Sequence, residues 1–262
     1  MNRKQTKKIG DDFLKTVLDT HIHTVACNHA YSTIGENAAS AKSKGLELIC
    51  ITEHGPKLPG GPHPYYFANI KVVPPELEGV KILKGIESNI MDTSGGLDLP
   101  PQYKNKMEII LAGLHSKCFS PGSKRENTKA VIKAMENDFV DIIVHIGNPA
   151  YELDYPDVLK AAKDTNTLIE INNSSFVHSR KGSYDNCFNV AKECMKREIM
   201  ISLGSDAHIA SDVGEFGVAK KILDVIEFPQ ELVINTSVSK LTKYLESKGR
   251  VLFVDPRENT NQ

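Results

Sequence analysis

Histidines and acidic residues stand at the ends of apolar segments along most of this chain. Seven of its nine histidines occupy such positions, together with two acids. Imidazole nitrogens and carboxylate oxygens are donors that suit zinc, manganese and iron. A lone histidine after an apolar segment is usually structural, but a set of this size predicts a metal cluster. The candidate ligands are His21, His23, His29, His54, Glu87, His115, His145, Asp206 and His208.

Seven apolar segments rich in Val, Ile and Leu must position these side chains. Helical patterns alternate with the segments, which is typical of βαβ units and a parallel sheet. In a parallel α/β barrel the carboxyl ends of all strands lie on one rim, so ligands spread from position 21 to position 208 would converge there. The two-residue spacing of His21 and His23 would place both on one face of an extended segment. The expected strands are Lys15–His21, Leu46–Thr52, Lys81–Glu87, Glu108–His115, Val140–His145, Thr167–Asn172 and Ile199–Gly204.

Capping residues and apolar periodicity predict the helices between these strands. The irregular stretches Gly55–Gly79 and Met91–Lys106 are long for loops, so we expect them to form the rim of the site. The tail Phe228–Gln262 is expected to add a strand at Leu232–Ile234 and a helix around Leu241–Leu245. The other expected helices are Thr33–Lys44, Asn127–Asn137, Asp157–Lys163, Tyr184–Lys196 and Val213–Val225.

Composition limits the classes of protein to consider. With 40% hydrophobic and 25% charged residues in 262 positions, we expect one large domain. A net charge of -1 and the absence of tryptophan make nucleic-acid binding an unfavoured function. No stretch reaches the roughly 20 apolar residues of a membrane span, and a cytoplasmic protein is expected.

The remaining histidines and the cysteines are expected to play minor parts. The five cysteines are odd in number and form no C-x-x-C pair, which indicates reduced thiols. Cys27 lies close to the histidines, but they suffice as ligands without it. His63 and His178 lie in loop-like segments and are expected at the rim or, for His63, simply exposed.

Four short motifs carry a resemblance to a known family. H-x-H at 21–23, T-E-H-G at 52–55, G-I-E at 85–87 and S-D-A-H at 205–208 resemble the polymerase and histidinol phosphatase (PHP) superfamily. The strings H-T-V-A-x-x-H-A-Y-S-T, N-N-S-S-F-x-H-S-R-K-G and G-S-D-A-H are similar to those of YcdX-type phosphatases, and the similarity covers about residues 17–250. One position departs from the pattern, because Glu53 stands where Asp is expected, and this puts the tuning of the metal in question.

The resemblance implies a fold and a ligand assignment. The fold is a distorted (β/α)7 TIM-like barrel in a single domain 1–262, with a core of about 15–250 and short tails. Three ions, usually zinc, with manganese or iron as alternatives, would occupy the site. A homo-trimer is a further, weaker implication. The first ion would take His21, His23, Glu87 and Asp206; the second Glu87 as a bridge, His115 and His145; the third His29, His54 and His208.

The predicted function is hydrolysis of small phosphate monoesters by a hydroxide held between the ions. Asp19 is a candidate either for orienting a ligand imidazole or for a plain buried hydrogen-bond role. Arg180 is a candidate phosphate-binding residue, with an exposed loop charge as its alternative. Three other functions stay open: histidinol-phosphate phosphatase, a phosphodiesterase or 3′-to-5′ exonuclease, and a metal-binding sensor or store without turnover.

Overall fold

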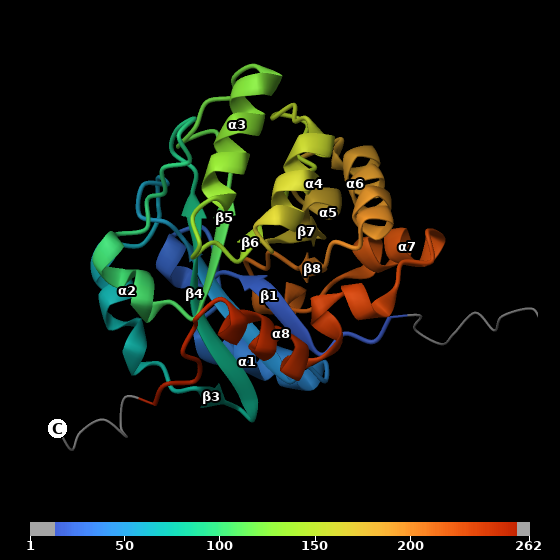
Figure 1. Cartoon of the computed structure of the whole chain (residues 1–262). Helices are drawn as coiled ribbons and strands as arrows, with labels where there is room; N and C mark the ends of the chain where they lie inside the picture. Colours follow the sequence, from blue (N-terminus) through green and yellow to red (C-terminus); the bar gives the residue numbers. More distant parts are fainter. Residues whose placement is uncertain (1–13, 256–262) are drawn as a thin grey trace, which may run out of the picture.

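Seven parallel strands form a nearly closed barrel in a single α/β domain, as predicted (Figure 1). The computed structural model describes residues 14–255, so the ends of the predicted tails lie outside the described residues. The strand order is β1-β2-β4-β5-β6-β7-β8, and the short β3 pairs antiparallel with β4. The strands are β1 Leu18–Ile22, β2 Leu48–His54, β3 Glu76–Leu77, β4 Val80–Asn89, β5 Ile109–Gly113, β6 Ile142–Ile143, β7 Leu168–Asn172 and β8 Ile201–Gly204.

The first and last strands meet along a seam that few backbone hydrogen bonds close. Ile22 and Ala207 form an isolated parallel bridge just beyond β8. Lower in the barrel, the hydroxyls of Thr20 and Ser202 lie 2.5 Å apart, both fully buried. Side-chain contacts therefore join β1 to β8 where the regular backbone hydrogen bonds between strands stop.

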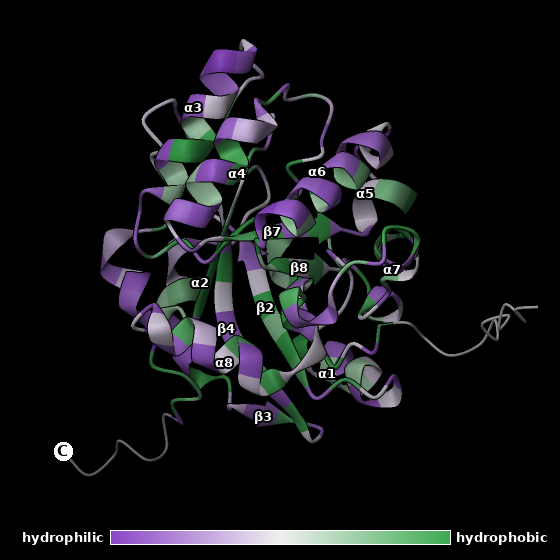
Figure 2. Cartoon of the chain, turned by 45° about the vertical axis from the view of Figure 1, so that its right-hand side comes forward, coloured by the Kyte–Doolittle hydropathy of each residue, from purple (hydrophilic) through white to green (hydrophobic). Residues whose placement is uncertain are grey.

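Helices surround the strands and turn their apolar sides inward (Figure 2). Two of them begin with a capping box, in which Thr33 pairs with Glu36 and Ser123 pairs with Glu126. Such caps satisfy the free backbone N–H groups of the first turn. None of the helices in 14–255 is long and apolar enough to cross a membrane. The helices are α1 Ile34–Ser43, α2 Pro64–Asn69, α3 Lys124–Met135, α4 Tyr155–Asp164, α5 Ser174–Val177, α6 Ser183–Arg197, α7 Gly217–Val225 and α8 Val238–Ser247.

The tail supplies the expected helix, α8, but the strand predicted at Leu232–Ile234 was wrong. This segment forms two 3-10 turns, and only Val233 bridges to Ile201. The buried Asn235 explains the difference: its Oδ1 accepts from Leu203 N at 2.7 Å, and its Nδ2 donates to Leu18 O and Leu203 O. A side chain thus supplies hydrogen bonds that a further strand would have made.

The amino ends of the strands are closed by buried ion pairs and by hydrogen bonds to the C-terminal segment. Buried Asp141 accepts from Arg250 at 3.0 Å, and Arg250 also donates to Phe139 O. Lys84 lies 3.5 Å from the Glu108 carboxylate and donates to Val254 O. Within residues 14–255 this end of the barrel is therefore sealed, and the cavity described below opens at the opposite rim.

Candidate metal centre

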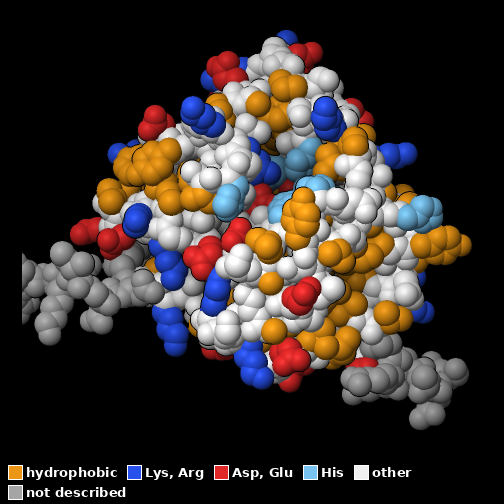
Figure 3. Space-filling view, turned by 180° about the vertical axis from the view of Figure 1, so that it is seen from behind, with side chains coloured by type: hydrophobic (Ala, Val, Ile, Leu, Met, Phe, Trp, Pro, Cys, Tyr) orange, Lys and Arg blue, Asp and Glu red, His pale blue; other side chains and the backbone are white. Residues whose placement is uncertain are grey.

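Histidines and acids gather in a hollow at the carboxyl ends of the strands. Figure 3 shows pale blue histidines around a depression with red carboxylates deep inside it. The cavity measures about 550 Å³. Exposed apolar side chains, including Tyr31 and Ile209, stand at its mouth. Its polar lining includes His29, His54, His115, His178, Arg180, Asp206 and His208.

Glu87 lies at the centre of the cluster because β4 runs between β2 and β5. Its Cα is in register with that of His54 on β2. Its Oε1 lies 2.7 Å from His145 Nε2 and 3.1 Å from His115 Nε2. Its Oε2 lies 2.7 Å from His54 Nδ1 and 3.5 Å from His21 Nε2. One fully buried carboxylate therefore faces imidazoles from four other segments.

Asp206 supplies the second carboxylate of the cluster. Its Oδ1 lies 3.2 Å from His23 Nε2 and 3.6 Å from His21 Nε2, across the seam between β1 and β8. Its Oδ2 accepts from Arg180 at 3.0 Å. Asp206 (φ 54°) and His145 (φ 40°) both adopt the left-handed backbone region, which non-glycine residues enter at a cost. The chain thus carries backbone strain at two of the candidate ligands.

The remaining candidates, His29, His54 and His208, lie together nearer the mouth. The ring centroid of His29 lies 5.0 Å from that of His54 and 5.0 Å from that of His208. The centroids of His54 and His208 are 5.8 Å apart. The donor atoms of His23, His54 and His208 lie within 4.8 Å of one another. All nine candidate ligands are therefore brought into one cluster.

Unpaired buried donors and acceptors suit this cluster to cations. Glu87 Oε2, Asp206 Oδ1, His54 Nδ1 and His115 Nε2 are buried and make no hydrogen bond. Buried polar atoms of this kind need a partner, and metal ions among them would satisfy all four. Burial opposes ionisation of Glu87, but His115, His54 and His21 outweigh it and hold its pKa well below the usual value. The carboxylate is therefore ready to bind a cation.

Glu170 on β7 contacts two of the candidate ligands and was not among the residues predicted from the sequence. Its Oε1 accepts from His21 Nδ1 at 2.7 Å, and its Oε2 accepts from His145 N at 2.9 Å. A carboxylate on the second nitrogen of an imidazole leaves the first free for a metal. Thr167–Asn172 was the one expected strand without an assigned ligand, and an acid inside that apolar segment was the available signal.

The contacts of Asp19 are hydrogen bonds with backbone N–H groups, which fit the plainer of its two predicted roles. Its Oδ1 accepts from the backbone N–H groups of His21 and Ser205, and its Oδ2 accepts from Gly214 N. Burial raises the pKa of Asp19 to about 6, although these hydrogen bonds oppose the shift. Asp19 therefore joins β1 to the loop after β8.

Glu53, the position that departs from the family pattern, lies behind His23. Its Oε1 accepts from Thr24 N at 2.7 Å, while its Oε2 lies 3.9 Å from His23 Nδ1. Burial raises the pKa of Glu53 to about 7.

Buried Cys27 is close enough to His29 and His208 to share an ion with them. Burial raises the pKa of its thiol to about 12, which disfavours the thiolate that metals bind.

The two other histidines lie outside the cluster. His63 is exposed, as predicted, and caps α2 by accepting from Tyr65 N. His178 stands on the cavity rim with its side chain 64% exposed, 3.3 Å from Asp212.

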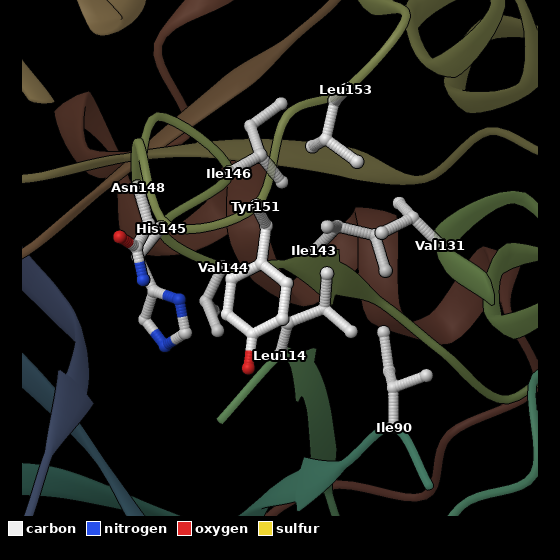
Figure 4. Close-up of a pocket in the computed structure, with 10 residues that line it drawn as sticks. All are labelled: Ile90, Leu114, Val131, Ile143, Val144, His145, Ile146, Asn148, Tyr151 and Leu153. Carbon is white, nitrogen blue, oxygen red and sulfur yellow. The ribbon is translucent and has the colours of Figure 1, made fainter. Parts of the chain in front are cut away.

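A second, much smaller cavity borders His145 on its outer side. It holds about 10 Å³ and is lined mainly by apolar side chains such as Val131 and Leu153 (Figure 4). Tyr151 in its wall donates to Phe119 O at 2.6 Å. A space of this size holds at most about one water, so this cavity is packing around His145 rather than a ligand site.

Comparison with known proteins places the chain among phosphatases. The PHP domain family model matches residues 19–244. A protein named probable phosphatase from Caldanaerobacter subterraneus subsp. tengcongensis is 54% identical over 238 residues, covering 90% of this chain and 94% of that one. A protein of the same name from Clostridium novyi is 49% identical, covering 91% of this chain and 98% of that one.

A solved structure shares the fold. Histidinol phosphate phosphatase from Lactococcus lactis subsp. lactis, in complex with zinc, L-histidinol and phosphate, matches with a TM-score of 0.57 at 19% identity. The match covers 82% of this chain and 95% of that one.

Proposed function

This chain belongs to the PHP family of metal-dependent phosphatases, and we propose that it hydrolyses small phosphate monoesters at a site for three ions. The observation that carries the proposal is the position of Glu87, a buried carboxylate in contact with imidazoles from β1, β2, the loop after β5 and the loop after β6. Such a carboxylate can bind two neighbouring cations at once, one through each oxygen, and so join two sets of ligands.

We assign the ligands in three sets, of which the first two share Glu87. The first set lies across the seam, the second lies around Oε1 of Glu87, and the third lies at the mouth. Zinc suits these donors, and the Lactococcus lactis protein contains zinc. The sets are His21, His23, Glu87 and Asp206; then Glu87, His115 and His145; then His29, His54 and His208.

The ions, when bound, would make a nucleophilic water available near neutral pH and neutralise phosphoryl oxygens. The chain itself positions the substrate. Arg180 lines the cavity with a side chain that is only 15% exposed, and one of its guanidinium nitrogens forms an ion pair with Asp206. Its remaining N–H groups can bind a phosphate dianion. The hydroxyls of Ser175 and Ser179 lie 3.4 and 3.0 Å from the same guanidinium nitrogen and steady it.

A substrate panel tests the proposal. Elemental analysis should find zinc in the purified protein, and an aryl phosphate should be hydrolysed before chelation and not after it. His145→Ala serves as the control, because it removes a ligand near Glu87. Activity of the metal-loaded protein no greater than that of this variant, across monoesters and diesters, would overturn the hydrolase proposal. A preference for diesters would favour a phosphodiesterase, and a preference for histidinol phosphate would favour that narrower phosphatase.

A further inference from the structure

A buried carboxylate on the loop between β4 and β5 lies behind the metal centre without touching a candidate ligand. Asp98 is 8% exposed. Its Oδ1 accepts from Ser88 Oγ at 2.9 Å and from Asn89 N at 2.7 Å. Its Oδ2 accepts from Lys57 N at 2.9 Å and from Asn89 Nδ2 at 2.6 Å. Four donors thus fix this carboxylate between the end of β4 and the loop after β2.

Asp98 determines which way the Asn89 amide points. A carboxylate can only accept hydrogen bonds, so the amide must present its NH2 group to Asp98. The same NH2 group also faces Gly55 O at 3.3 Å. The amide oxygen is then turned to His115, where Asn89 Oδ1 lies 2.7 Å from the ring Nδ1. An amide orientation that is often ambiguous is settled here by the chemistry of its partners.

The amide oxygen in turn decides the proton position on His115. Because Oδ1 can only accept, Nδ1 of His115 must carry a hydrogen, and in the neutral ring that binds a metal Nε2 keeps its lone pair. Nε2 is buried without a hydrogen bond and lies 3.1 Å from Glu87 Oε1. The only nitrogen of this ring with a free lone pair is therefore the one inside the cluster.

Gly55 makes room for the carboxylate. A Cβ at this position would lie 2.1 Å from Asp98 Oδ1 and 2.4 Å from its Oδ2. The glycine that follows His54 is thus required by Asp98, which is 43 positions further along the chain. This close approach is a second, independent sign that the place of the carboxylate is built into the fold.

We propose that Asp98 is a positioning residue that, through Asn89, selects the Nδ1-protonated tautomer of His115 and so prepares Nε2 for one metal ion. The inference rests on the proposed metal centre, in which His115 is a ligand of the second ion. Asp98→Asn removes the selection, because a neutral amide at 98 can donate to Asn89 Oδ1 and let the Asn89 NH2 group turn toward His115.

Zinc affinity and the His115 tautomer test the proposal together. In competition with a chelator, Asp98→Asn should weaken one zinc ion by about 10- to 100-fold, the usual effect of losing a group behind a metal ligand. Ser88→Ala is the matched control: it removes another hydrogen bond from the same carboxylate without freeing the Asn89 amide, and all ions should bind as in the wild type. Equal losses in both variants would mean that Asp98 acts only by holding the loop.

Asn89→Asp provides a second variant if Asp98→Asn does not fold. An acid at 89 shares a proton with Asp98 and still presents an accepting oxygen to His115, so zinc binding should stay near wild type. Loss of one ion in this variant would contradict the tautomer argument. Nitrogen-15 NMR of the metal-free wild type, at a pH at which the His115 ring is neutral, should find its single proton on Nδ1, and a single proton on Nε2 would overturn the inference. Because that spectrum needs no metal, it decides the inference even if the wild type binds no zinc, a result that would instead overturn the proposed function.

Discussion

Glu170→Gln probes the most heavily used supporting contact of the proposed metal centre. Glu170 Oε1 accepts from His21 Nδ1, and its Oε2 accepts from His145 N and from Asn172 Nδ2. Glutamine keeps one accepting oxygen and replaces the other with an NH2 group, which would face a donor. The side chain is 1% exposed, so water cannot repair the mismatch.

The cost can be worked from the contacts with His21 and His145. Losing one buried, charge-assisted hydrogen bond costs about 1.5–3 kcal/mol, which corresponds to roughly a 10- to 100-fold loss of metal affinity. Only one of the two contacts is lost, but Glu87 belongs both to the first proposed ligand set, with His21, and to the second, with His145, so both of these ions should weaken. The third ion, held by His29, His54 and His208, should not.

The experiment is a competition between the protein and a chelator, in which the number of zinc ions bound per chain is measured. It distinguishes the two weakened sites from the third. At a free zinc concentration that fills all sites of the wild type, Glu170→Gln should retain about one ion. Glu108→Gln is the matched control, since this buried glutamate accepts from Lys84 N at the sealed end of the barrel. That variant should unfold at a lower temperature yet keep its full zinc content. If Glu170→Gln held all ions as tightly as the wild type, or lost the third as readily as the others, our assignment of Glu170 would be wrong.

Three further variants test the phosphate site and the sealed end. Arg180→Gln should lower kcat/KM for an aryl phosphate about 10- to 100-fold, because a charge-assisted contact is lost; unchanged kinetics at full zinc content would exclude Arg180 from phosphate binding. Burial raises the pKa of Asp141 to about 6 despite Arg250, so the folded state binds this proton more tightly than the unfolded state. The wild type therefore loses free energy of unfolding as pH rises from about 4 to about 6, while Asp141→Asn does not lose this contribution. Urea unfolding of chelator-treated protein should show the difference in free energy of unfolding shifting by up to roughly 3 kcal/mol in favour of Asp141→Asn over that range. Parallel pH curves for the two proteins would refute the shift. Arg250→Ala should lower the free energy of unfolding by about 3–5 kcal/mol at pH 8 and by less at pH 5, where Asp141 takes up its proton; an equal loss at both pH values would show that the ion pair is not the cause.

The sequence was most informative where residue type and strand position coincide. Each apolar segment ending at a histidine or acid predicted both a strand and a ligand candidate, and the parallel barrel then accounts for their meeting at one rim. His21, Glu87 and His145 were found in this way, although β6, before His145, is only two residues long.

Residues that act through another side chain were harder to predict. Asp98 and Asn89 are ordinary polar residues in the sequence, and only the folded loop brings the carboxylate to the amide. The left-handed backbone at His145 and Asp206 has no sequence signal, since neither residue is glycine. Asn235 replaced a predicted strand because a side-chain amide can supply hydrogen bonds that apolar periodicity does not reveal.

The seam between β1 and β8 has a consequence for biosynthesis. The first proposed ligand set draws on His21 and His23 at one side of the seam and on Asp206 at the other. A chain leaving the ribosome therefore carries its first two histidines through most of translation before their acidic partner emerges. In the proposed assignment, metal loading of this set is then a late event, because products that terminate before position 206 lack its last ligand.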